Sequence, residues 1–153
     1  MNSPYLPIAL GMTPLMVRRI IDNLPAACYD AKPDEKRFSL REAVAHLADW
    51  ESIHLSRIQA AVENPGSSMP DIDEGQKAID GDYAHRSPHA EATRFIAERP
   101  ALITYLAGIN PEDWHKTFVH SVKGEMSVLE YAATILGHDV YHLDHLLEYL
   151  PVQ

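Results

Sequence analysis

The sequence predicts an all-α protein that folds as a single bundle of four helices. Four segments carry apolar residues at the spacing of amphipathic helices, and no segment shows a convincing strand pattern. A chain of this length can bury ~70% of the surface that its unfolded form exposes, so we expect one compact domain. That domain comprises residues 1–153. Helices with one apolar face bury it against each other, which favours a bundle.

Capping and breaking residues delimit the first two helices. The first is expected from about Thr13, with a proline at its favoured first position, to a break near Pro25. The second opens with Ser39 and Glu42, which can satisfy each other's unpaired backbone amides as a capping box. It continues to about residue 63, where an Asn-Pro-Gly sequence stops it.

The third and fourth helices follow the same logic. The third covers about residues 87–108, and Pro100 inside it is expected to kink the helix or split it in two. The fourth opens with a second capping box, Ser127 and Glu130, and ends at Pro151.

Two connections between the helices are long. Residues 66–86 are rich in Gly, Pro, Asp and Ser, and residues 110–126 contain two aromatic residues and a glycine. Loops longer than ~12–15 residues are uncommon unless they are functional or mobile. These two segments are therefore candidates for shaping a site.

Composition excludes several classes of function. The net charge of −9 disfavours binding to nucleic acid or to an anionic membrane surface, because both select basic faces. No apolar run approaches the ~20 residues of a membrane span, and the N-terminus lacks the pattern of a secretory signal. The single cysteine, Cys28, excludes an internal disulfide. Together these features predict a cytoplasmic protein.

Histidines at helical spacing are the most informative feature of the chain. His138, His142 and His145 share one stripe of the fourth helix, and neutral imidazole is a common ligand for zinc, nickel and iron. The best candidate for a further ligand is His46, which lies in a predicted apolar row with Ala43, Trp50 and Ile53. A lone histidine on such a face is usually a hydrogen-bonded core residue. The whole constellation nevertheless favours a metal site in the bundle core.

The same residues resemble a known family. Residues 38–51 are similar to the S-x-x-E-x-x-x-H-L-x-D-x-E segment of the DinB/YfiT-like family of metal-dependent enzymes. The end of the chain is similar to the same family in Trp114, His120, Gly124 and Ser127, followed by the helix with His138 and His142. The resemblance covers nearly the whole chain in the expected order.

The resemblance implies a fold, a cofactor and an activity. The fold is an up-down-down-up four-helix bundle with a divalent ion, zinc or nickel, between helices two and four. The family's ligand positions fall on His46, His138 and His142. Such an ion activates water in a hydrolase or a low-molecular-weight thiol in a transferase. The alternative is a non-catalytic metal-binding bundle. A small-molecule substrate, a thiol being one candidate, and a homodimer are the expected partners.

One position departs from the family pattern. Many relatives carry glutamine where this chain has His145. His145 is either a fourth ligand, a hydrogen-bonding group near the site or a replacement for that glutamine. Three protein ligands with one open position are typical of catalytic sites, and four of structural ones. Reaching the same ion from His145 would strain its side chain, so we expect it outside the ligand set, hydrogen-bonded nearby.

Other polar residues are weaker candidates. Asp49 and Glu51 are able to orient the ligands, but surface carboxylates are the favoured interpretation. Residues 138–142 resemble the zincin motif H-E-x-x-H, although Asp139 is one carbon shorter than the glutamate base. His54 is expected on the surface. The remaining candidates are expected in solvent (His85, His89), in the loop entering the last helix (His115, His120) or in the core (Tyr105, Trp114, Phe118).

Overall fold

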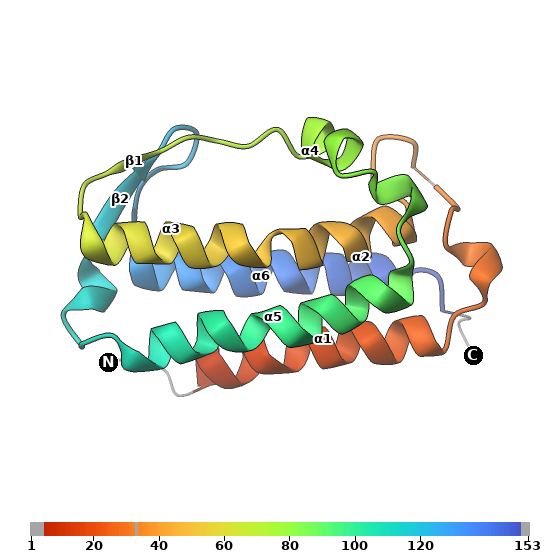
Figure 1. Ribbon diagram of the computed structural model, residues 1–153, viewed down its shortest axis with the longest axis horizontal. Coiled ribbons are helices and arrows are strands. Elements are labelled where there is room, and N and C mark those ends of the chain that lie inside the picture. The colour runs from red at the N-terminus through yellow and green to blue at the C-terminus, as the bar shows by residue number, and fades with distance from the viewer. Residues whose placement is uncertain (1–4, 33, 151–153) are drawn as a thin grey trace.

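The computed structural model describes residues 5–32 and 34–150. Four rods run along the long axis of the molecule, and one of them consists of two helices placed end to end (Figure 1). The rods are α1 (Tyr5–Asp22), α2 with α3 (Leu40–Asp49 and Glu51–Glu63), α5 (Pro88–Gly108) and α6 (Val128–Leu147). None of the helices in these described residues is long and apolar enough to cross a membrane.

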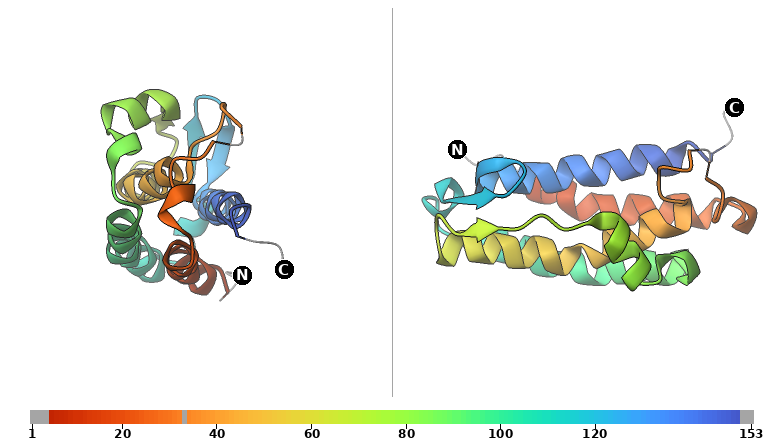
Figure 2. Two further views of the ribbon diagram at one scale, coloured as in Figure 1. Left: turned by 90° about the vertical axis from the view of Figure 1, so that its right-hand side faces the viewer. Right: turned by 90° about the horizontal axis from the view of Figure 1, so that it is seen from above.

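The rods form a closed ring in up-down-down-up order. α1 and α6 run in one direction, and α2–α3 and α5 run in the other (Figure 1). α1 packs against α5 and α6, and the α2–α3 rod packs against the same two helices from the other side. The end-on view in Figure 2 shows the four rods at the corners of a square. The predicted four-helix bundle is confirmed.

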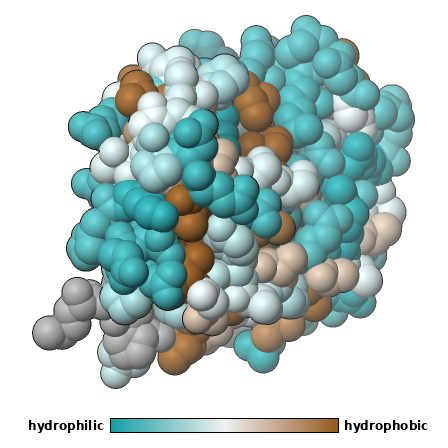
Figure 3. Space-filling view, turned by 60° about the vertical axis from the view of Figure 1, so that its left-hand side comes forward, coloured by the Kyte–Doolittle hydropathy of each residue, from teal (hydrophilic) through white to brown (hydrophobic). Residues whose placement is uncertain are grey.

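The prediction that the chain lacks strands is wrong. A small sheet of β1 (Ser68–Met69), β2 (Thr117–His120) and β3 (Gly124–Ser127) covers one end of the bundle (Figures 1 and 2). β1 pairs parallel to β2, and β2 pairs antiparallel to β3. The strands are too short to show an alternating pattern, and β1 meets its partner only through the tertiary fold. Seen from the sheet end, the surface is mostly hydrophilic with scattered apolar residues (Figure 3).

The two long connections contain further short helices. The first connection includes α4 (Glu74–Asp80), which lies over α2 (Figure 1). The second connection contains a helical turn at Asp113–His115, followed by the β2–β3 hairpin. Three single turns of 3-10 helix complete the fold: Ala26–Cys28, Tyr83–His85 and Asp113–His115.

Helix boundaries differ from the predictions at the prolines. α1 begins at Tyr5 and passes through Pro14. A proline removes the N–H that would bond the carbonyl four residues earlier, here that of Leu10. Thr13 Oγ1 and Arg99 Nη1 donate to that carbonyl instead, at 3.1 and 3.0 Å. α5 likewise continues through Pro100 without being split.

The core consists of two apolar clusters separated by a polar layer. One cluster gathers around Val17, Leu47, Phe95 and Leu146, and the other around Leu10, Ile58, Leu102 and Ile135. Along each rod the residues between these clusters are polar or charged and buried. They are Thr13 on α1, His46, Glu51 and His54 on α2–α3, Arg99 on α5, and Asp139 and His142 on α6. This layer holds the candidate site.

Candidate metal centre

Three of the predicted ligand residues meet between α2 and α6. The capping box of Ser39 and Glu42 starts α2, and His46 lies in its last turn. His138 and His142 are one turn apart on α6. One nitrogen from each of the three imidazoles lies within 4.8 Å of the others, and His46 Nε2 is 2.8 Å from His138 Nε2. The arrangement can hold a single ion.

Burial keeps all three imidazoles neutral. Desolvation lowers the pKa of His46 to about 3, of His138 to about 4 and of His142 to about 2. The neighbouring imidazoles add to this effect at His46 and His142. A metal-binding imidazole must be unprotonated. The site therefore presents its ligands in the required form at pH values well below neutrality.

The three rings have nitrogens without protein partners. The Nδ1 atoms of His46, His138 and His142 are buried and accept or donate no hydrogen bond within the described residues. The nitrogens known to approach each other are the Nε2 atoms of His46 and His138, which point in a different direction from Nδ1, so the fit to a metal rests on the convergence of the rings. A set of three neutral imidazoles is also the donor set that zinc-like ions prefer. The residues present thus fit a divalent metal.

His145 lies outside the cluster of three, as expected. Its ring is buried and stacks between His142 and Tyr149, with ring centroids 6.3 and 6.0 Å away. The expected hydrogen bond is not found among the described residues. Burial and the charge of Arg37 lower the pKa of His145, so its ring is neutral near pH 7.

A cavity of about 430 Å³ opens beside the cluster. His138 and His142 line its inner wall together with His145 and Tyr141. The remaining walls come from the segment before α2 and from the start of α4: Lys36, Arg37, Phe38, Glu74 and Gly75. The histidines are therefore accessible to a small molecule although they lie in the bundle core.

The prediction that His54 is exposed is wrong. His54 is only 4% exposed, and its ring lies 5.7 Å from that of His138. The helix breaks at Trp50, and the His54 ring packs in the bundle interior against Trp50 and Tyr131. Tyr131 Oη lies 3.1 Å from His54 Nδ1 and accepts a hydrogen bond from Arg57. His54 Nε2 and Trp50 Nε1 have no partner among the described residues.

The carboxylates next to the histidines are bound mainly to Arg99, although Asp139 Oδ1 also lies 4.0 Å from His138 Nδ1. Asp139 and Glu51 are nearly fully buried and both bind Arg99, at 2.6 and 2.7 Å. Thr13 donates to Asp139 as well. The zincin-like alternative is therefore wrong, because Asp139 is committed to Arg99. The prediction that Glu51 lies on the surface is also wrong, because Glu51 is buried and paired with Arg99. Burial raises the pKa of Glu51 despite the opposing effect of Arg99.

Asp49 is half-buried, and neighbouring cations balance the charge of its carboxylate. Although burial alone would raise the pKa of Asp49, hydrogen bonds from Tyr83, Lys77 and Arg94 lower it to about 2. The Asp49 carboxylate accepts from Tyr83 Oη at 2.7 Å and pairs with Lys77 at 3.0 Å. Its role is to fasten the α4 region and α5 to α2, and it makes no contact with the histidine cluster.

The other predicted residues lie away from the cluster. His120 is buried in β2, where its Nδ1 accepts from two backbone amides of the hairpin turn. His85 and His89 are exposed, as expected, and His115 is exposed in the segment before β2. The three aromatic residues belong to the core, as expected. Trp114 and Phe118 are buried in the apolar cluster around Ile58 and Leu102, and Tyr105 packs against that cluster.

Comparisons with known proteins agree with this arrangement. The chain is 27% identical over 115 residues to an Oceanobacillus iheyensis protein named "Putative metal-dependent hydrolase OB0413". The match covers 73% of this chain but only 64% of that protein, so just under two thirds of the relative is represented.

A solved structure has the same fold. It is that of YfiT from Bacillus subtilis, described as "a probable metal-dependent hydrolase with an unusual four-helix bundle topology". The TM-score is 0.89 at 15% identity, over 97% of this chain and 88% of that one. The sequence profile of the DinB superfamily matches residues 9–146, and the chain therefore belongs to the DinB superfamily.

Proposed function

We propose that this protein is a metal-dependent enzyme whose divalent ion, zinc or nickel, is held by His46, His138 and His142. The observation that carries the proposal is the convergence of three neutral imidazoles, two of which, His138 and His142, line a cavity. An ion in such a site supplies Lewis-acid chemistry, which lowers the pKa of a bound water or thiol. Three protein ligands leave a coordination position for one of these molecules.

The surrounding residues prepare the site for this chemistry. Phe38 and Trp50 pack on the His46 ring, with centroids 5.2 Å away in both cases, and keep water from that side of the cluster. His145 faces the cavity as a neutral ring and can accept a proton from a molecule bound there. Both similar proteins are described as metal-dependent hydrolases, which supports hydrolysis. A thiol transferase is the other activity that the same donor set serves.

We further propose that the substrate is a small molecule that fits the cavity, and that the protein works in the cytoplasm. The cavity of about 430 Å³ falls within the ~300–1,000 Å³ range of small-molecule sites. A single cysteine is typical of a reducing compartment, in which low-molecular-weight thiols are abundant.

Cobalt substitution tests this function, because the visible spectrum of cobalt reports on its ligands. Purified, untagged protein is loaded with Co²⁺ and titrated with azide and with 2-mercaptoethanol. We expect either ligand to change the spectrum: a response to the thiol supports the transferase, and a response to azide alone supports the hydrolase. The exposed-histidine variant His85→Asn should respond like the unchanged protein. A cobalt spectrum that neither ligand alters would support the non-catalytic bundle and overturn the enzymatic proposal.

A further inference from the structure

The cavity beside the histidines carries positive charge in an otherwise acidic protein. Lys36 and Arg37 line it, against a single carboxylate, that of Glu74. The whole chain has a net charge of −9, so its long-range field repels anions. Two cations gathered at the mouth of this one cavity are therefore a local exception to the charge of the molecule.

The guanidinium of Arg37 has N–H donors that bind no protein group within the described residues. Its Nη1 donates to both oxygens of Glu148, at 3.0 and 3.1 Å. This pair is exposed to solvent and therefore weak. Arg37 Nε is buried and has no partner within the described residues. A guanidinium offers five N–H donors in a plane and is suited to bidentate binding of a carboxylate or phosphate.

The segment that carries the two cations is held firmly against the site. Phe38, the next residue, packs on His46 and lies 6.4 Å from the ring of Tyr83. Ser39 then caps α2. The guanidinium of Arg37 also lies 5.8 Å from the centre of the Tyr141 ring, on the wall of the same cavity. Arg37 is thus held beside the histidines, and Lys36 directly precedes it on the same segment.

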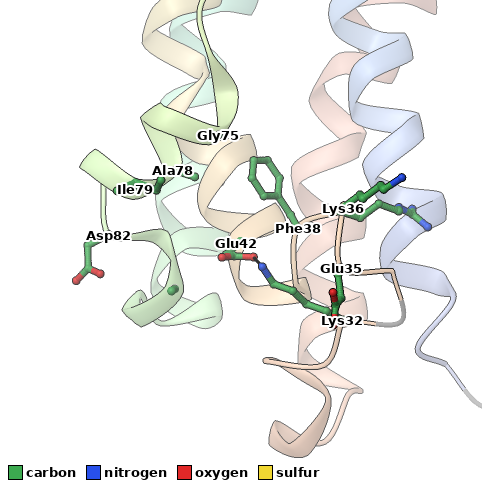
Figure 4. Close-up of a pocket in the computed structure, with 11 residues that line it drawn as sticks. Lys32, Glu35, Lys36, Phe38, Glu42, Gly75, Ala78, Ile79 and Asp82 are labelled. Carbon is green, nitrogen blue, oxygen red and sulfur yellow. Dashed lines mark ion pairs between the residues drawn. The ribbon is translucent and has the colours of Figure 1, made fainter.

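A neighbouring hollow of about 410 Å³ shares Lys36, Arg37, Phe38 and Gly75 with this cavity. It adds Lys32 and three carboxylates, so its charges balance, whereas the cavity beside the histidines adds only the carboxylate of Glu74. Lys32 in this hollow is committed to Glu42 at 2.7 Å. In Figure 4 Lys32 reaches Glu42, whereas Lys36 extends away from that pair. The ammonium of Lys36 forms no ion pair within the described residues.

We propose that the substrate carries an oxyanion group, a carboxylate or a phosphate, which Arg37 and Lys36 bind while its reacting end lies at the histidine cluster. This inference rests on the proposed function, since it assigns the substrate class of the same site. It explains why Lys36 and Arg37 both line a cavity that ends at the histidines. Oxyanion binding also orients the substrate, because both of its ends are held.

Paired ligands that differ only in charge test the inference. Zinc-loaded protein is titrated calorimetrically with ω-mercaptocarboxylic acids of increasing chain length and with the matching neutral amides. We expect the best acid to bind about tenfold more tightly than its amide, since charge-assisted hydrogen bonds are the strong ones. ω-Mercaptoalkyl phosphates compared with the acids tell which oxyanion is preferred.

Substitutions assign the preference to its residues. Arg37→Gln with Lys36→Gln should lower the affinity for the acid to that for the amide and leave the amide unaffected. Lys32→Gln removes the same charge from the neighbouring hollow and should leave the preference intact. Equal binding of acid and amide, or a preference that survives the double substitution, would overturn the inference alone. If neither ligand bound the zinc-loaded protein, the open metal position itself would be refuted, and the inference with it.

Discussion

Two buried polar clusters lie side by side in the middle of this bundle and differ in how their hydrogen bonds are completed. In the cluster around Arg99, the guanidinium binds Glu51, Asp139 and the Leu10 carbonyl, all within the protein. In the histidine cluster, buried nitrogens of His46, His138 and His142 have no partner among the described residues. The two clusters are adjacent in sequence, since Asp139 directly follows His138.

The difference indicates a structural role for the cluster around Arg99 and a functional role for the histidine cluster. A buried polar group without a partner costs about 1–3 kcal/mol, so the histidine cluster contributes less to stability than the cluster around Arg99 and is the better candidate for a functional site. The cluster around Arg99 is complete and fastens α1, α3, α5 and α6 together. The histidine cluster is incomplete and opens onto a cavity. We therefore expect opposite responses when a member of each cluster is replaced.

The largest effect is expected from Arg99→Met. The substitution leaves the carboxylates of Glu51 and Asp139 buried without a counter-charge, which should lower the free energy of unfolding by about 3–5 kcal/mol. His142→Leu should change it by less than about 1 kcal/mol in metal-free protein, because it removes a group that has no partner. Urea unfolding followed by circular dichroism measures both. A larger loss for His142→Leu than for Arg99→Met would reverse the comparison.

Acid should destabilise the metal-free protein through its buried histidines. The pKa values of about 2–4 in the folded state lie below the ~6.5 of unfolded chains, so the unfolded state binds more protons below that pH. The free energy of unfolding should fall as the pH drops from about 6.5 towards 4, by at most ~1.4 kcal/mol per pH unit for each histidine. Unfolding in urea with a chelator present, over this pH range, measures the slope.

The change of the unfolding free energy with pH should arise from the buried histidines. It should be reduced in His142→Leu and unchanged in His115→Asn, whose ring is exposed. Equal slopes in the unchanged protein and in His142→Leu would show that the acid response arises elsewhere.

A smaller effect is expected from Tyr131→Phe at the edge of the histidine cluster. The Tyr131 hydroxyl contacts both His54 and Arg57, and its removal leaves two buried groups without this partner. We expect a loss of about 1–2 kcal/mol in the free energy of unfolding. Tyr149→Phe, which removes an exposed bond to the Ala31 carbonyl, is the matched control and should cost less. A cost for Tyr131→Phe no greater than that of the control would show that His54 is not positioned by Tyr131.

Local patterns predicted the helices and put His138 and His142 together, whereas the place of His46 beside them was expected from its apolar row and from the family resemblance. The capping boxes at Ser39 and Ser127 mark true helix starts, and the spacing of His138 and His142 puts both on one helical face. These signals lie within a few residues of each other, where helix geometry alone decides the outcome.

The rest depends on contacts between distant segments. Arg99 buries itself among partners from three other helices, so its neighbours in sequence do not reveal the cluster. His54 is buried because its ring packs against Tyr131 and His138 of α6, more than seventy residues later in the chain. β1 pairs with a strand about fifty residues later in the chain, a pairing that no local pattern records.

Metal content tests the central claim most directly. Untagged protein, purified without a nickel column and dialysed, should contain one divalent ion per chain when its metal content is measured by inductively coupled plasma mass spectrometry. His142→Ala should lose the ion, and His145→Gln should keep it with at most a modest loss of affinity. Metal-free unchanged protein that takes up no zinc or nickel would contradict the claim. Equal loss in the two variants would make His145 a ligand, close the site and remove the physical basis of the proposed catalysis.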